Sequence, residues 1–156
     1  MELARVELDE ANVSCSSLSG LVTAGVWLRT GEEYFPGKGW DDFAVVIVAA
    51  WVDASLQLLR GDRQSVQIEF MDGPYAIGIT RVTPREWSLT LVERRRSGQV
   101  ERFLTADAGP LVDSLVDVSD RLVRMCQQRG WVSPDSERLA ALVDSLRDDW
   151  EIGQRE

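Results

Sequence analysis

The chain has 156 residues, the size of one ordinary domain, and 44% of them are hydrophobic, which is enough for a packed core and excludes a disordered protein. Its formal net charge is −9, and a negative field of this size repels nucleic-acid phosphates and anionic lipids. We therefore expect a single domain over residues 1–156 that binds neither nucleic acid nor a membrane directly. The charge favours a basic protein partner, and solubility alone is the other explanation for it.

The N-terminal third predicts two strands and a helix. The strands are expected at residues 3–9 and 21–29, with a loop at residues 12–19 between them. After a turn-rich segment at 31–39, Asp41 or Asp42 is expected to cap a helix that ends at Gly61. The apolar run that begins at Phe43 is too long for a strand, so we expect a helix buried on most of its circumference.

Four strands joined by short turns are expected in the middle of the chain. They lie at residues 66–70, 75–79, 87–93 and 100–104. Between the first two, Asp72 and Gly73 form a typical hairpin turn, since both residue types tolerate positive φ. Arg94, Arg95 and Arg96 make a basic cluster at a later hairpin tip, where a solvated end that discourages edge pairing is the simplest role.

Two helices close the chain. Pro110 is expected to open the first, which ends at Gly130, and Ser133 to cap the second, which continues to Trp150. The expected architecture is α+β: an antiparallel sheet of five or six strands with one inserted helix and two C-terminal helices packed on one face.

Little in the sequence points to catalysis. The chain has no histidine, no Cys-x-x-Cys pair and no phosphate-binding glycine loop, so we expect no catalytic residue, no metal and no cofactor, and we do not expect an enzyme. Cys15 and Cys126 are expected to be free thiols in a reducing compartment. With no visible signal peptide and no apolar run long enough to span a bilayer, the protein is expected to be cytoplasmic.

Aromatic residues gather around the turn-rich segment. Trp27, Tyr34, Phe35 and Trp40 surround it, and Tyr75 lies beside the Asp72–Gly73 turn. Such side chains serve either as lids on the core or as anchors in an interface, and the sequence leaves both roles open.

Two segments carry a resemblance to a known kind of protein. They read Tyr-Phe-Pro-Gly-Lys-Gly-Trp-Asp-Asp-Phe at residues 34–43 and Ile-Glu-Phe-Met-Asp-Gly-Pro-Tyr at residues 68–75. They resemble small acidic bacterial immunity proteins of polymorphic toxin systems, over residues 34–80. The resemblance implies that the protein neutralises a cognate toxin, a basic protein partner, by tight binding. The expected partner-binding residues are Glu32, Glu33, Trp40, Asp41, Asp42, Asp72 and Tyr75.

Other roles compete for these residues and for the whole chain. Helix capping competes for Asp41 and Asp42, and the turn competes for Asp72. An adaptor or chaperone for a secreted effector is an alternative function, as is a small-ligand-binding protein. A deep pocket lined by Arg81, Arg85 or the tryptophans would favour a small-ligand site. The sequence predicts no particular oligomeric state.

Overall fold

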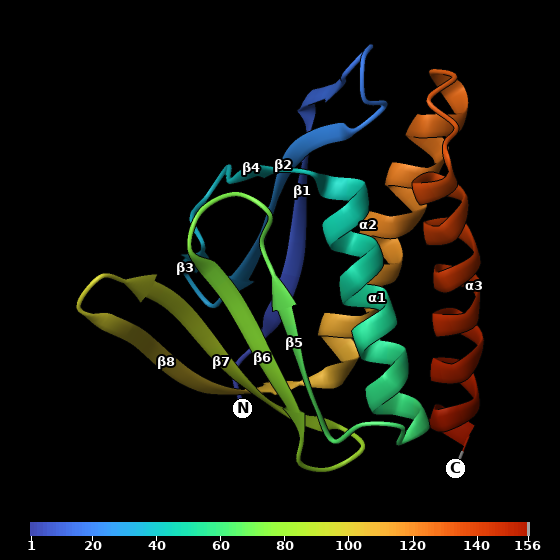
Figure 1. Ribbon diagram of the computed structural model, residues 1–156. Coiled ribbons are helices and arrows are strands. Elements are labelled where there is room, and N and C mark those ends of the chain that lie inside the picture. Colours follow the sequence, from blue (N-terminus) through green and yellow to red (C-terminus); the bar gives the residue numbers. More distant parts are fainter. Residues whose placement is uncertain (156) are drawn as a thin grey trace.

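Two antiparallel sheets of four strands each form the β part of this computed structural model, which describes residues 1–155 (Figure 1). The strands of the first sheet are β1 Ala4–Cys15, β2 Val22–Thr30, β3 Glu33–Phe35 and β4 Asp41–Asp42. The strands of the second sheet are β5 Ser65–Glu69, β6 Tyr75–Arg81, β7 Glu86–Arg95 and β8 Gly98–Asp107. In the first sheet the other three strands pair with β2, whereas β5 to β8 pair in chain order. The α+β class is confirmed, and the expected single sheet of five or six strands is wrong.

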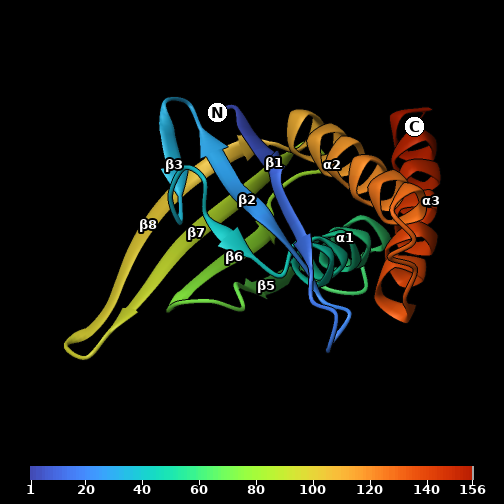
Figure 2. The same cartoon turned by 90° about the horizontal axis from the view of Figure 1, so that it is seen from above.

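The edge of β1 explains why the strands do not form one sheet. The helix α2, Ala108–Gln128, continues directly from β8 and packs along β1, where Ser114 Oγ accepts a hydrogen bond from the Val6 backbone N–H at 2.8 Å. One parallel bridge, between Glu2 and Ala106, connects β8 to the N-terminal segment. Because α2 occupies the edge of β1, the hairpin of β1 and β2 crosses the second sheet instead of extending it (Figure 2).

Three helices cover the sheets in two layers. The helix α1, Ala44–Arg60, packs against β2 and β5, and α2 packs against β1. The third helix, α3 Pro134–Arg155, packs against α1 and α2 and forms the outermost layer (Figures 1 and 2). We expected both C-terminal helices to lie on a sheet face. Only α2 does, because α3 packs against the other two helices.

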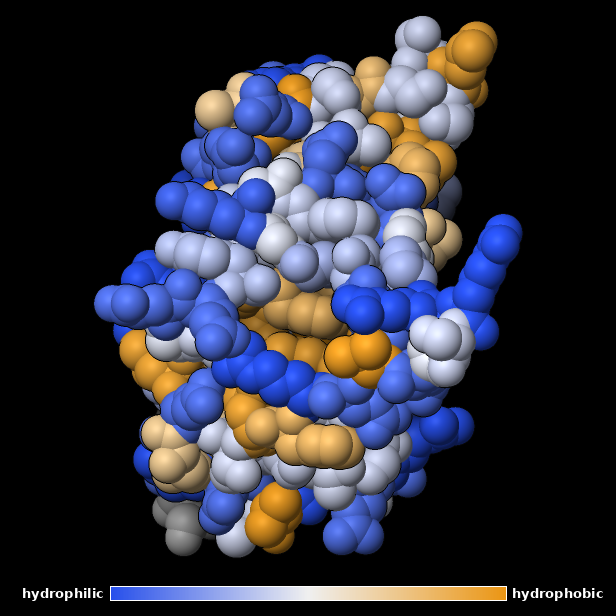
Figure 3. All heavy atoms as spheres, turned by 90° about the vertical axis from the view of Figure 1, so that its left-hand side faces the viewer, coloured by the Kyte–Doolittle hydropathy of each residue, from blue (hydrophilic) through white to orange (hydrophobic). Residues whose placement is uncertain are grey.

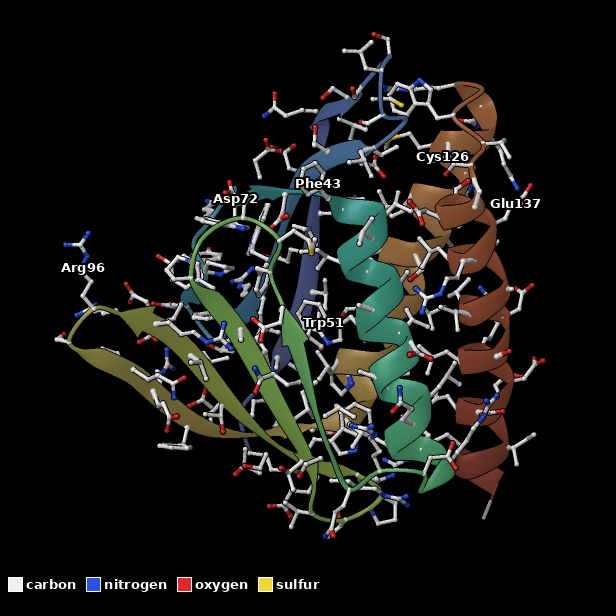
Figure 4. The ribbon with its side chains drawn as sticks, in the orientation of Figure 1. Phe43, Trp51, Asp72, Arg96, Cys126 and Glu137 are labelled. Atoms are coloured by element: carbon white, nitrogen blue, oxygen red, sulfur yellow. The ribbon has the colours of Figure 1, made fainter. Side chains whose placement is uncertain are left out.

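The helix α1 is buried on most of its circumference, as its apolar run predicts. It lies between the sheets and α3, and its Trp51 side chain is 0% exposed, pointing into the shared core (Figure 4). Burial of one such side chain stabilises the fold by roughly 1.5–3 kcal/mol. No helix within residues 1–155 combines the length and the apolarity that crossing a membrane requires.

Two boundaries in the first half differ from expectation. β1 continues to Cys15 beyond a register shift that follows Asp9, so the loop predicted at residues 12–19 begins only at residue 16. The first residue of α1 is Ala44, and its N-cap position is Phe43, without a side-chain cap. The prediction that Asp41 or Asp42 caps this helix is therefore wrong.

The C-terminal helix starts were predicted with mixed success. α2 begins two residues before Pro110, because Asp107 Oδ1 accepts the Gly109 backbone N–H at 2.9 Å and caps the helix there. The Ser133 cap of α3 is confirmed, since Ser133 Oγ accepts the Ser136 backbone N–H at 3.2 Å. The predicted start of α3 is therefore correct. The predicted start of α2 is wrong, because Asp107 caps the helix before Pro110 is reached.

Candidate functional site

The buried carboxylate of Asp42 joins two distant segments at the N-terminal end of α1. Asp42 is only 3% exposed, and its carboxylate accepts three hydrogen bonds. Asp42 Oδ1 accepts the Phe43 backbone N–H at 2.7 Å, while Oδ2 accepts Trp40 Nε1–H and the Asp72 backbone N–H, both at 3.1 Å. Hydrogen bonds to a charged acceptor contribute about 1.5–3 kcal/mol each, so this carboxylate fixes the loop, the helix start and the hairpin turn together.

A chain of aromatic rings connects this point to the core. Trp40 meets Tyr75 edge to face with ring centroids 5.1 Å apart, and Tyr75 meets Phe35 at 5.6 Å. Phe35 then meets Phe70 at 6.0 Å, and Phe70 meets Trp51 of α1 at 6.4 Å. Perpendicular pairs of this kind add about 0.5–1.5 kcal/mol each beyond the area they bury. We call the cluster of Phe35, Trp40, Asp41, Asp42, Asp72 and Tyr75 the Asp42 corner.

Gly73 lets the hairpin turn approach Trp40. Its φ is +75°, and a Cβ added there would lie 3.0 Å from the Trp40 ring and 3.1 Å from the Tyr75 ring. A side chain at this position would be strained by the backbone and would also push the rings apart. The predicted turn at Asp72 and Gly73 is confirmed, although only Gly73 has a positive φ. The contact with the Trp40 and Tyr75 rings is a second reason for glycine at this position, and the sequence does not reveal it.

Five of the seven predicted partner-binding residues meet at this corner. Trp40 and Tyr75 are partly exposed, whereas Asp41 and Asp72 are exposed. Within residues 1–154, whose side chains are described, neither Asp41 nor Asp72 forms an ion pair. Asp42 is buried and serves the structure, so it cannot contact a partner directly. In Figure 4, Asp72 in the β5–β6 turn and Phe43 at the start of α1 lie at the same end of the molecule, where the backbone N–H groups of both donate to Asp42.

The other two predicted residues lie away from the corner. Glu32 is exposed in the turn before β3, and Glu33 begins that strand. Glu33 forms an ion pair with Arg102 of β8, whereas Glu32 forms none among the described side chains. At about 3.3 Å per residue, Glu33 and Glu32 lie roughly 7 and 10 Å from Phe35 along the chain.

The remaining aromatic residues of this region lie on the outer face of the first sheet. Trp27 is 7% exposed, and its Nε1–H donates to Glu7 Oε1 at 3.0 Å. The Tyr34 ring carries Arg29 and Lys38 at 5.9 and 5.5 Å from its centroid. Trp27 is therefore held by a residue of the neighbouring strand β1, while the Tyr34 ring packs against two positively charged side chains.

The basic cluster at the β7–β8 tip is partly neutralised. Arg94 donates two hydrogen bonds of 2.7 Å to the Glu69 carboxylate, which lowers the pKa of Glu69. Arg95 pairs with Glu93 at 3.0 Å, and Arg96 points away from the molecule at the tip (Figure 4). Exposed ion pairs of this kind contribute at most about 1 kcal/mol each to the stability of the fold.

The face that carries β3 and the β7–β8 hairpin is largely hydrophilic, and hydrophobic residues gather near its centre between hydrophilic side chains (Figure 3). Residues 1–154 hold no group of three or more cysteine and acidic side chains arranged to bind a metal ion. Comparisons with protein-family models, with curated proteins and with solved structures found no match to this chain. The resemblance over residues 34–80 therefore stays a prediction.

Proposed function

We propose that the protein is a non-catalytic, cytoplasmic protein-binding domain, and specifically an immunity protein that neutralises a cognate bacterial toxin by tight binding. The observation that carries this proposal is the Asp42 corner. It presents the unpaired carboxylates of Asp41 and Asp72 around the partly exposed rings of Trp40 and Tyr75 on a rigid base. Aromatic anchors with charged neighbours on a preorganised backbone are typical of strong protein interfaces.

Electrostatics support a basic partner. The net charge of −9 would accelerate association with a positively charged surface, such as the cleft of a toxin that acts on nucleic acid. Asp41 and Asp72 would contact such a surface directly, with Glu32 extending the contact along β3. Asp42 would act by holding Trp40 and the hairpin turn in place.

The test begins with capture of the partner from the native cell lysate on the tagged protein, followed by washes across a salt series. The captured partner is then assayed for toxicity or nuclease activity with and without this protein. We expect a basic partner whose activity is abolished in the stoichiometric complex. A partner that stays active in the complex, or that is released before it acts, would instead favour an adaptor or chaperone.

A matched pair of double variants tests the surface. Asp41→Asn with Asp72→Asn should weaken binding about tenfold or more, mainly through slower association at low salt. The control, Asp113→Asn with Glu137→Gln, makes the same change in net charge at exposed positions on α2 and α3 (Figure 4). Equal losses in the two double variants would mean that only overall charge matters, and the Asp42 corner would lose its role.

A further inference from the structure

A pocket of about 740 Å³ lies at the opposite end of α1 from the Asp42 corner. Its walls come from the last turn of α1, the loop between β6 and β7, and the last turns of α3 (Figure 1). Its volume is within the range of about 300–1,000 Å³ that is usual for small-molecule sites. The 17 residues of α1 separate it from the Asp42 corner by roughly 25 Å, so a ligand here would be independent of the proposed toxin interface.

The pocket is basic although the protein is acidic. Arg60 lines it from the end of α1, Arg81 and Arg85 line it from the end of β6 and the loop that follows, and Asp149 is the one acidic residue among its described lining residues. The lining therefore carries a formal charge of +2, three positive charges against one negative, in a chain of −9. Asp62 and Asp53 also act on Arg60 from outside the lining. Positive charge concentrated in a concave surface attracts small anions more strongly than the same charge on a convex one.

Each of the three guanidinium groups is held by a neighbour. Arg60 Nε–H donates to Asp149 Oδ2 at 2.6 Å, and Arg81 Nη1–H donates to the Leu58 carbonyl oxygen at 3.0 Å. Arg85 donates through Nη2–H to the side-chain oxygen of Gln154. A guanidinium group has five N–H donors, so each arginine is oriented by one bond and keeps others for a ligand. This arrangement lowers the entropy lost when an anion binds.

Apolar side chains complete the pocket. Leu59, Pro84 and Ile152 line it together with Trp150, whose ring is half-buried against the core. A flat apolar group could pack on this wall while an attached anion reaches the guanidinium groups. The lining thus combines the aromatic wall and the few convergent charged groups that are usual in ligand sites.

We propose that this pocket binds a small phosphate monoester that carries a flat apolar or aromatic group. A phosphate monoester brings about −1.5 to −2 charges and three acceptor oxygens, which match a lining charge of +2 and several free N–H donors. A carboxylate brings only one charge. The minimal probe of this chemistry is phenyl phosphate.

The experiment titrates the full-length protein with phenyl phosphate and follows the Trp150 indole and the backbone amides of the pocket by NMR. We expect saturable shifts at these positions, weaker binding of inorganic phosphate and of benzoate, and no binding of phenol. Arg85→Gln should weaken phenyl phosphate binding about tenfold, because it removes one charge-assisted contact. Arg124→Gln, at an exposed position on α2, is the matched control and should leave the affinity unchanged.

Several results would overturn the proposal. Absence of saturable binding would remove the site, and the wild-type titration gives this answer without any variant. Equal affinity for benzoate would mean that the pocket does not select a dianion. Equal affinity for inorganic phosphate would mean that the apolar wall plays no part, and an unchanged affinity in Arg85→Gln would place the ligand elsewhere.

Discussion

Asp42 accepts a hydrogen bond from the backbone N–H of Asp72 at 3.1 Å and so connects residues thirty positions apart. The same carboxylate oxygen accepts Trp40 Nε1–H, whose ring packs against Tyr75 beyond the hairpin turn. The loop before α1 and the β5–β6 turn therefore form one rigid unit. A partner that recognises either segment would meet both in a fixed arrangement.

The first prediction concerns the stability of this unit. Asp42→Ala should lower the free energy of unfolding by about 3 kcal/mol, because it leaves the partly buried donors of Trp40 and Asp72 without their acceptor and removes the bond to the Phe43 backbone N–H. Asp41→Ala, at the exposed neighbouring position, should change it by less than about 0.5 kcal/mol. Urea unfolding of both variants measures the difference. Similar stabilities would show that the three hydrogen bonds contribute little.

The second prediction separates backbone strain from ring contact at Gly73. Gly73→Ala should cost more than the roughly 1–2 kcal/mol that a positive φ imposes on alanine, because the new Cβ also meets the Trp40 and Tyr75 rings. Gly130→Ala is the matched control, since Gly130 has a φ of +70° and no atom within 4 Å of an added Cβ. Thermal unfolding compares the two. If Gly130→Ala is equally destabilising, the ring contact has no energetic weight.

The third prediction concerns the edge of β1. Ser114→Ala removes the acceptor of the Val6 backbone N–H and should cost about 1 kcal/mol, with faster hydrogen exchange at Val6. Ser119→Ala on the same helix removes a buried hydroxyl that has no partner among the described residues, so it should be neutral or stabilising. Hydrogen exchange and unfolding measurements check both variants. A loss of stability in Ser119→Ala as large as that in Ser114→Ala would contradict the prediction.

Local chemistry explains which features the sequence could predict. The Asp72–Gly73 turn and the Ser133 cap depend on residues within three or four positions of one another, and both were predicted correctly. The alternating strands of the second sheet were also predicted, because period-two patterns report burial directly.

Long-range contacts explain the failures. The split into two sheets goes with the packing of α2 along β1, where Ser114 contacts Val6, 108 residues away, and no local pattern encodes that packing. In the same way, Asp42 was taken for a helix cap because its acceptor role toward Asp72 could not be seen. Sequence reasoning named Arg81 and Arg85 as possible pocket residues, but it missed Arg60 and Asp149, which meet across α1 and α3.

The last prediction concerns the two thiols. Cys126 is 1% exposed, and burial, followed by the nearby Cys15, raises the pKa of its thiol. Because the thiolate is the reactive form, a neutral alkylating reagent at pH 8 should modify the partly exposed Cys15 about tenfold faster than Cys126. Peptide mapping by mass spectrometry measures both rates, and modification of Cys126 should accelerate only in denaturant. Equal rates in the folded protein would contradict the prediction.

The raised pKa also has a consequence for stability. A folded-state pKa above the unfolded value stabilises the fold fully below the unfolded pKa of about 8.5, and this contribution is lost as pH rises through the folded pKa. Wild type should therefore lose stability more steeply than Cys126→Ala as pH rises above about 8.5, whatever the cavity costs that variant at neutral pH. Urea midpoints across this range provide the measurement. Parallel pH profiles would show that the Cys126 thiol does not ionise differently in the folded and unfolded chains.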